Sequence, residues 1–201
     1  MESREIVKRD RNFLNMRFIL FFIIIALALG IGYFVYSQRS SQENISEPKL
    51  KENMTIASSQ FRHNGRIPAK YTCDGDNVSP PLEVRDIPEA SKSLALIVDD
   101  PDAPAGIWVH WTVWNIDPKT AQISENGIPA GAVEGRTSFG KPGYGGPCPP
   151  SGTHRYFFKL YALDTILDLS TQADMRMLEG AMKGRILDKA ELIGLYNRKS
   201  D

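Results

Sequence analysis

Short apolar or alternating runs recur from residue 54 onward, separated by clusters of Pro, Gly, Asn and Asp. Alternation with a period of two is typical of half-buried strands, and the clusters between the runs are typical of turns. This spacing favours a sandwich of antiparallel strands over repeated strand–helix–strand units, so the expected fold class is mainly β. The runs that we expect to form strands are residues 55–67, 94–98, 108–116, 156–163 and 192–196.

One short helix is predicted near the C-terminus. Its helical spacing is carried by Met175, Leu178, Met182 and Ile186. Three residues precede this segment as possible N-caps: Ser170, Thr171 and Asp174. Because Gly180 and Gly184 lower the intrinsic helix propensity, the stability of this helix should depend on packing against the sheet.

A stretch of 21 residues without a single charge, Phe18 to Gln38, precedes the globular region. As a helix it is about 31 Å long, close to the hydrocarbon thickness of a bilayer. A buried core helix would show one polar face, and this segment shows none. Its apolar run continues through Tyr33–Tyr36, beyond the usual apolar region of a cleaved signal, so we predict one uncleaved transmembrane helix.

Basic residues are denser before this span than after it. Five precede it and three follow it: Arg4, Lys8, Arg9, Arg11 and Arg17, then Arg39, Lys49 and Lys51. The positive-inside rule therefore predicts a single-pass protein of the cytoplasmic membrane, with its C-terminal domain outside the cytoplasm. The expected organisation is a cytoplasmic tail over 1–17, a membrane anchor over 18–38, a flexible tether over 39–53 and a globular domain over 54–201.

The overall composition excludes several classes of protein. With 24 basic and 24 acidic residues, the chain lacks the excess of Lys and Arg that a broad nucleic-acid-binding face requires, so nucleic acid is not expected as a partner. A hydrophobic content of 42 % excludes disorder of the whole chain. The two cysteines, Cys73 and Cys148, allow at most one internal disulfide and exclude a zinc site built mainly from thiolates.

The first candidate for chemistry is the segment Asp99–Pro104, which follows the apolar run LALIV. Pro101 cannot continue a strand ladder and biases Asp100 toward an extended conformation, so two carboxylates should emerge at a strand end. If the extended conformation continues, the side chains of Asp100 and Asp102 point the same way. The alternative is a solvated turn in which the aspartates accept local hydrogen bonds.

A second candidate is His110, which alternation places on one strand face with Thr112 and Trp114. In so aromatic a strand, this histidine is either a satisfied core residue or part of a site.

The third candidate is the loop over 145–153, which is rich in Pro and Gly and leads into a strand where His154 and Tyr156 face inward together. A few polar groups at the end of an apolar face are typical of a ligand pocket. Arg155 should face the other way, as a surface charge or as the partner of a carboxylate.

Five blocks of the sequence together resemble the phosphatidylethanolamine-binding protein family, in its bacterial and archaeal, Raf kinase inhibitor-like branch. They are YTCDGDNVSPPL (71–82), LALIVDDPDAP (94–104), WVHWTVWNI (108–116), GYGGPCPPSGTHRYFFKLYALD (143–164) and AELIGLYNR (190–198). The resemblance covers residues 54–201. It implies a β-sandwich with C-terminal helical elements and a small pocket that accepts phosphate-like anions.

The resemblance also implies which residues form that pocket. The ligand-binding positions carried over are Asp100, Asp102, His110, Gly152, His154 and Tyr156. The rim positions are Pro101, Cys148, Pro149 and Pro150. Because a nearby carboxylate favours the imidazolium, the two aspartates should hold both histidines ready to donate to an anion, with the tyrosine hydroxyl as a further donor.

A disulfide between Cys73 and Cys148 is predicted as well. The resemblance places both cysteines near the pocket, in segments that read as loops. Export would put them in an oxidising compartment.

Two functional classes remain open at this stage. The first is a membrane-anchored regulatory module that binds a small anionic or phosphorylated ligand and inhibits an unidentified protease or signalling protein. The second is a hydrolase that uses the Asp/His pocket for acid–base or metal-assisted catalysis. The chain has no Gly-x-Ser-x-Gly elbow and no phosphate-cradling Gly-x-x-x-x-Gly-Lys loop, so the binding module is favoured and no cofactor is expected. His110, His154 and a carboxylate form a conceivable zinc set, but no short ligand spacing supports a metal site.

Overall fold

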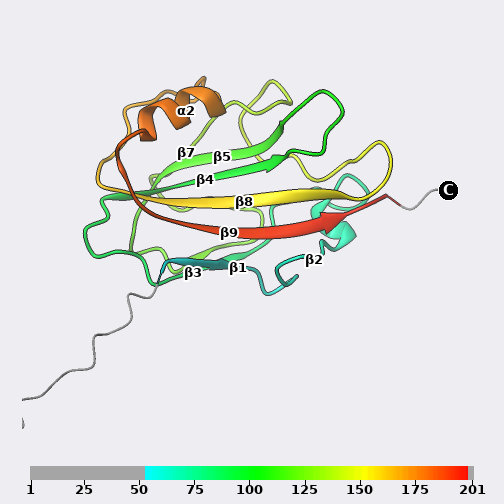
Figure 1. Ribbon diagram of the computed structural model, residues 1–201, viewed down its shortest axis with the longest axis horizontal. Helices are drawn as coiled ribbons and strands as arrows, with labels where there is room; N and C mark the ends of the chain where they lie inside the picture. The colour runs from blue at the N-terminus through cyan, green and yellow to red at the C-terminus, as the bar shows by residue number, and fades with distance from the viewer. Residues whose placement is uncertain (1–52, 199–201) are drawn as a thin grey trace, which may run out of the picture. The chain divides into compact units, whose positions relative to one another are not determined.

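The computed structural model describes residues 53–198, which form a mainly β domain with one short α-helix (Figure 1). The predicted tail over 1–17 and anchor over 18–38 lie outside the described residues, as does all but the end of the tether. Within 53–198, no helix has the length and apolar character needed to cross a membrane.

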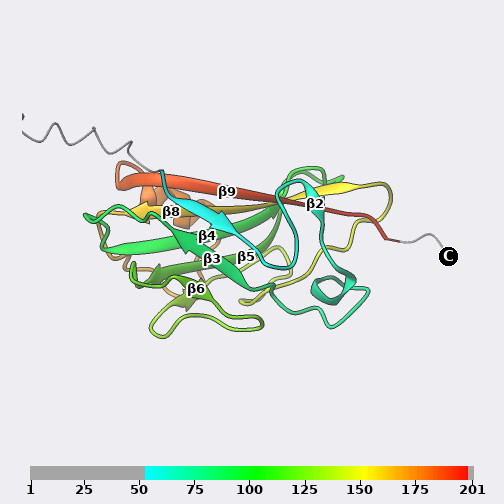
Figure 2. The same ribbon diagram turned by 90° about the horizontal axis from the view of Figure 1, so that it is seen from below.

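Two sheets of unequal size build the domain. The larger has the strand order β2-β9-β8-β4-β5-β7, and the smaller has the order β1-β3-β6. The elements are β1 (Thr55–Ala57), β2 (Gly65–Arg66), the 3-10 helix η1 (Ala69–Tyr71), β3 (Leu82–Arg85), β4 (Ser93–Asp100), β5 (Trp108–Ile116), β6 (Gln122–Ile123), β7 (Val133–Glu134), β8 (His154–Leu163), α2 (Met175–Met182) and β9 (Ile186–Tyr196). Figure 2 shows the smaller sheet in front of the larger one.

The sheets differ from the predicted sandwich of antiparallel strands. The expected strand over 55–67 is broken near Asn64, which has a φ of 59°, and its two ends join different sheets as β1 and β2. β2 pairs in parallel with β9, and the strands of the smaller sheet have two to four residues. The domain is therefore a large sheet with a small sheet on one side, and not a clear sandwich.

The centre of the larger sheet is β4, in which every residue is buried. Leu94, Leu96 and Val98 belong to a hydrophobic cluster that also contains residues of the smaller sheet. Ala95 and Ile97 belong to a second cluster on the opposite face. A strand covered on both faces reads as a continuous apolar run, which explains the segment LALIV in the sequence.

The second cluster lies under α2, which was predicted from helical spacing. Leu178 and Met182 are buried in this cluster, and the carboxylate of Asp174 caps the helix by accepting from the Met177 N–H at 2.9 Å. The helix ends at Met182 and not at the expected Ile186, because Gly184 adopts a φ of +75° and the chain turns into β9.

Candidate functional site

A β-bulge in β5 determines where His110 lies. Val98 of β4 pairs with Trp111, but Asp99 pairs with Val109, so one extra residue of β5 is fitted between these two pairs. A bulge of this kind interrupts the alternation of side chains along a strand. His110 therefore lines a cavity on one face, whereas Trp114 lies in the cluster under α2. The predicted shared face for these two residues was wrong, because alternation alone does not reveal a bulge.

The cavity beside His110 has a volume of about 220 Å³. The ends of β4, β5 and β8 supply its polar residues, and the connecting loops supply most of its apolar wall. It is lined by Asp100, Ala103, Pro104, Trp108, His110, Phe139, Cys148, Pro149, Pro150, His154 and Tyr156.

His154 and Asp100 form a buried pair at this cavity. The Nδ1 atom of His154 lies 2.7 Å from Oδ2 of Asp100, and the two side chains are 9 % and 5 % exposed. Since the carboxylate accepts the Nδ1–H, the Nε2 atom is the ring nitrogen that remains for a ligand. The second carboxylate oxygen of Asp100 accepts from the Asp102 N–H at 2.8 Å, which holds the carboxylate in place.

His110 is held by the backbone and not by a carboxylate. Its Nδ1–H donates to the carbonyl of Gly145, and the Gly145 N–H donates to the His110 carbonyl at 2.9 Å. Burial lowers the pKa of His110, which outweighs the opposite effects of the Gly145 carbonyl and the Asp100 charge. The expectation that carboxylates keep both histidines charged is therefore wrong for His110, whose neutral form is favoured and presents Nε2 as an acceptor.

Tyr156 contributes a hydroxyl that has no hydrogen-bond partner within residues 53–198. Its ring packs edge-on against the His110 ring, with the centroids 5.2 Å apart. Burial and the nearby charge of Asp100 raise the pKa of Tyr156, so the phenol keeps its proton. The hydroxyl is thus a buried donor at a cavity wall, available to a ligand.

Asp102 does not line the cavity, although it was predicted to share a direction with Asp100. The chain turns after Asp100, and the Asp102 carboxylate instead accepts from Nε and Nη2 of Arg155 at 2.9 and 2.6 Å. This ion pair lowers the pKa of Asp102 to about 2. Arg155 is exposed and faces away from the cavity, as the alternation of β8 predicted.

Two further positions suggested by the resemblance lie outside the cavity lining. Gly152 lies in the loop before β8 with a φ of +69°, and Pro101 lies in the turn after β4. Both residues determine the path of the backbone, and neither lines the cavity. The predicted rim residues Cys148, Pro149 and Pro150 do line it. Sequence reasoning missed Trp108 and Phe139, two partly exposed aromatic residues whose rings pack edge-on at 5.6 Å.

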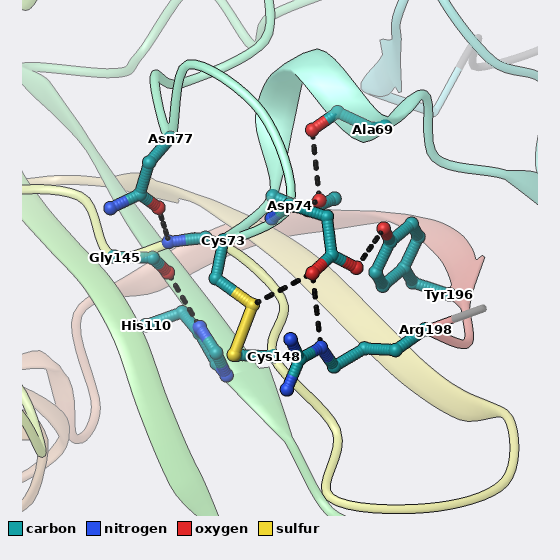
Figure 3. The surroundings of a disulfide bond; sticks show 11 residues. Ala69, Cys73, Asp74, Asn77, His110, Gly145, Cys148, Tyr196 and Arg198 are labelled. Atoms are coloured by element: carbon teal, nitrogen blue, oxygen red, sulfur yellow. Dashed lines mark hydrogen bonds and ion pairs between the residues drawn. A yellow bond between two sulfur atoms is a disulfide. The ribbon is translucent and has the colours of Figure 1, made fainter. Parts of the chain in front are cut away.

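The segment that carries Gly145 and Cys148 is tied to the chain around Cys73 (Figure 3). Cys73 and Cys148 form a disulfide with their Cα atoms 5.4 Å apart, and the Cys73 N–H donates to the Pro147 carbonyl. The Gly146 N–H donates to Oδ1 of Asn77 at 2.7 Å. A Cβ at Gly146 would lie 2.6 Å from that oxygen, so only glycine allows this close approach.

Residues 53–198 hold no group of three His, Cys, Asp or Glu side chains placed to bind a metal ion. The conceivable zinc set of His110, His154 and a carboxylate does not form such a group within these residues. The polar side chains that line the cavity are two imidazoles, one phenol and the carboxylate of Asp100.

Comparison with known proteins relates this domain to one family. A family model described as phosphatidylethanolamine-binding protein matches residues 57–197. The UPF0098 protein of Methanothermobacter thermautotrophicus is 51 % identical over 150 residues, which cover 72 % of this chain and 99 % of the relative. The UPF0098 protein of Pyrococcus abyssi is 51 % identical over 158 residues, which cover 74 % and 88 %.

Two solved structures are similar as well. A phosphatidylethanolamine-binding protein homologue from Chlamydia trachomatis has a TM-score of 0.71 and 41 % identity. YbcL from E. coli, described as a member of the mammalian PEBP family, has a TM-score of 0.70 and 31 % identity. Both comparisons cover 73 % of this chain and 99 % of the solved one.

The lowered pKa of His110 predicts a loss of stability in acid. The unfolded imidazole takes up a proton near pH ~6.5, whereas the folded one does so only at lower pH, so the free energy of unfolding falls as the pH drops below ~6.5. The contribution of one such group is at most about 1.4 kcal/mol per pH unit. In the His110→Gln variant, urea unfolding between pH 7.5 and 5.5 should show a smaller loss of stability than in the wild type. His63→Gln, which removes an exposed imidazole, should keep the wild-type loss. Equal pH dependence in His110→Gln and the wild type would contradict the assignment.

The disulfide should contribute substantially to stability. It joins residues 75 positions apart, and closing a loop of that length corresponds to about 4–5 kcal/mol in the chain-entropy model. Adding a reductant should lower the urea midpoint of the wild-type protein by an amount that reflects several kcal/mol. The Cys73→Ser/Cys148→Ser double variant should not respond to reductant. Thiol labelling of the denatured, unreduced protein should find no free thiol, and two per chain would rule the bond out.

Proposed function

This chain belongs to the phosphatidylethanolamine-binding protein family, and from this membership and the cavity we propose that it binds a small phosphate-like anion as a regulatory module. The observation that carries the proposal is the buried His154–Asp100 pair at the cavity wall. Because the carboxylate holds Nδ1 of His154, a ring that carries a proton on both nitrogens donates from Nε2 to an anion. The Tyr156 hydroxyl, unpartnered within the described residues, offers a second donor.

The neutral form of His110 adds a preference for a particular kind of anion. Because its Nδ1–H is engaged by the Gly145 carbonyl, its Nε2 atom can only accept a hydrogen bond. An anion that also carries a hydroxyl proton, such as a monoprotonated phosphate monoester, satisfies this acceptor and both donors together. Trp108 and Phe139 then offer partly exposed apolar surface to the organic part of such a ligand.

We also propose that residues 18–38 anchor the domain outside the cytoplasm, where it controls an unidentified protease or signalling protein. The support is the uncharged 21-residue segment and the excess of basic residues before it. A ligand-binding domain on a tether of this kind samples the membrane surface while its cavity stays accessible to solutes.

Binding of inorganic phosphate should depend on His154 much more than on Arg155. A charge-assisted hydrogen bond contributes about 1.5–3 kcal/mol, so His154→Ala should weaken phosphate binding about tenfold to a hundredfold. Arg155→Ala is the matched control, since Arg155 is adjacent in sequence but pairs with Asp102 outside the cavity. Isothermal titration calorimetry on the full chain measures both variants. Equal losses, or a larger loss for Arg155→Ala, would show that the wrong face of β8 has been assigned to the ligand.

The anchor can be tested by fusing a reporter that is active only in the periplasm after Asp201 and expressing the fusion in a Gram-negative bacterium. We expect a signal from the full chain, because the basic residues before the span hold the N-terminus in the cytoplasm. Deleting residues 1–38 should abolish the signal and give a soluble cytoplasmic product. A reporter active only in the cytoplasm when fused to the full chain would overturn the predicted orientation.

A further inference from the structure

A second cavity, of about 300 Å³, lies beside the first. The two cavities share structural elements: His110 of β5 lines the first and Trp111, the next residue, lines the second. The segment after β7 also serves both, since Tyr144 lines the second cavity and Cys148 lines the first. The second cavity has no role in the anion binding proposed above, and its chemistry is different.

Glu134 is the only charged residue that lines the second cavity. Its Oε1 atom accepts from the Nε1–H of Trp111 at 2.7 Å, which fixes the carboxylate against the wall. None of the ion pairs formed within residues 53–198 involves Glu134. A partly buried carboxylate without a cationic partner in this part of the chain creates a negative potential that favours a positively charged ligand.

The other lining residues add neutral acceptors and apolar walls. Ser79, which is only 3 % exposed, and Asn126 both line the cavity. A serine hydroxyl and an asparagine amide oxygen can accept hydrogen bonds, so the lining includes neutral acceptors besides the carboxylate. Trp111 and Tyr144 pack edge-on with ring centroids 5.6 Å apart. The Tyr144 hydroxyl donates to the Tyr71 carbonyl at 2.9 Å, so its polar end is already engaged elsewhere.

This combination selects the class of cation. A divalent metal ion requires several charged or strongly donating ligands, and the described residues contain no group of three such side chains. One carboxylate with aromatic and neutral polar neighbours instead suits an organic ammonium ion, which pairs its charge with the carboxylate and its apolar part with the rings. We propose that the second cavity binds the ammonium group of an alkylamine or an arylalkylamine.

Nuclear magnetic resonance of the ¹⁵N-labelled full chain in detergent micelles tests this proposal directly. Only three tryptophans are present, and the Trp111 indole N–H donates to the proposed anionic group, so its resonance reports on the second cavity alone. Titration with benzylammonium should shift this resonance in a saturable way. Benzyl alcohol, a neutral probe of nearly the same shape, should bind at least tenfold more weakly.

Glu134→Gln is the matched variant, because the glutamine oxygen can still accept from Trp111 while the charge is removed. It should weaken benzylammonium binding tenfold or more. Glu83→Gln removes a surface carboxylate that pairs with Arg85 and should leave the binding unchanged. Equal affinity for benzyl alcohol and benzylammonium in the wild type, or the absence of a saturable Trp111 shift, would overturn the proposal. Wild-type affinity in a folded Glu134→Gln variant would overturn it as well.

Discussion

The burial of β4 on both faces is the constraint on which the rest of the domain depends. A strand covered by the smaller sheet on one side and by α2 on the other can carry polar groups only where they find partners. At its end the strand carries two adjacent carboxylates that point to opposite faces. Asp99 pairs with Lys159 at 2.6 Å, and Asp100 pairs with His154 at 2.7 Å. The first pair places a cation beside the buried Asp99 carboxylate. The second pair lies at the candidate site.

The neighbouring acidic residues thus have separate functions that their spacing does not reveal. Burial raises the pKa of Asp99, whereas the exposed Arg155 lowers that of Asp102. Asp100 is the only one of the three that lines the cavity. The Asp-Pro-Asp sequence therefore contains one carboxylate that lines the cavity, followed by a second carboxylate that binds Arg155 at the start of β8.

The sequence was informative wherever one periodicity dominated a segment. The strands β4, β5 and β8 follow from their apolar or alternating runs, the helix α2 follows from helical spacing, and the inward direction of His154 and Tyr156 follows from alternation. Alternation failed where the chain departs from a regular ladder, at the bulge beside His110 and at the turn that redirects Asp102. Alternation also did not indicate that Phe139 lines the cavity. The Phe139 ring packs over Gly145, and both residues lie in loops that have no periodic pattern.

The bulge in β5 lies next to two cavities, because His110 lines the first and Trp111 lines the second. Trp111 and His110 are consecutive, yet one contacts an isolated carboxylate and the other contacts the backbone of the segment over 143–150. Without the bulge, regular alternation would place the imidazole on the strand face of Thr112 and Trp114, toward α2. The same sequence of side chains would then make a core strand. A single backbone insertion thus decides whether the imidazole lines a cavity or faces the interior under α2.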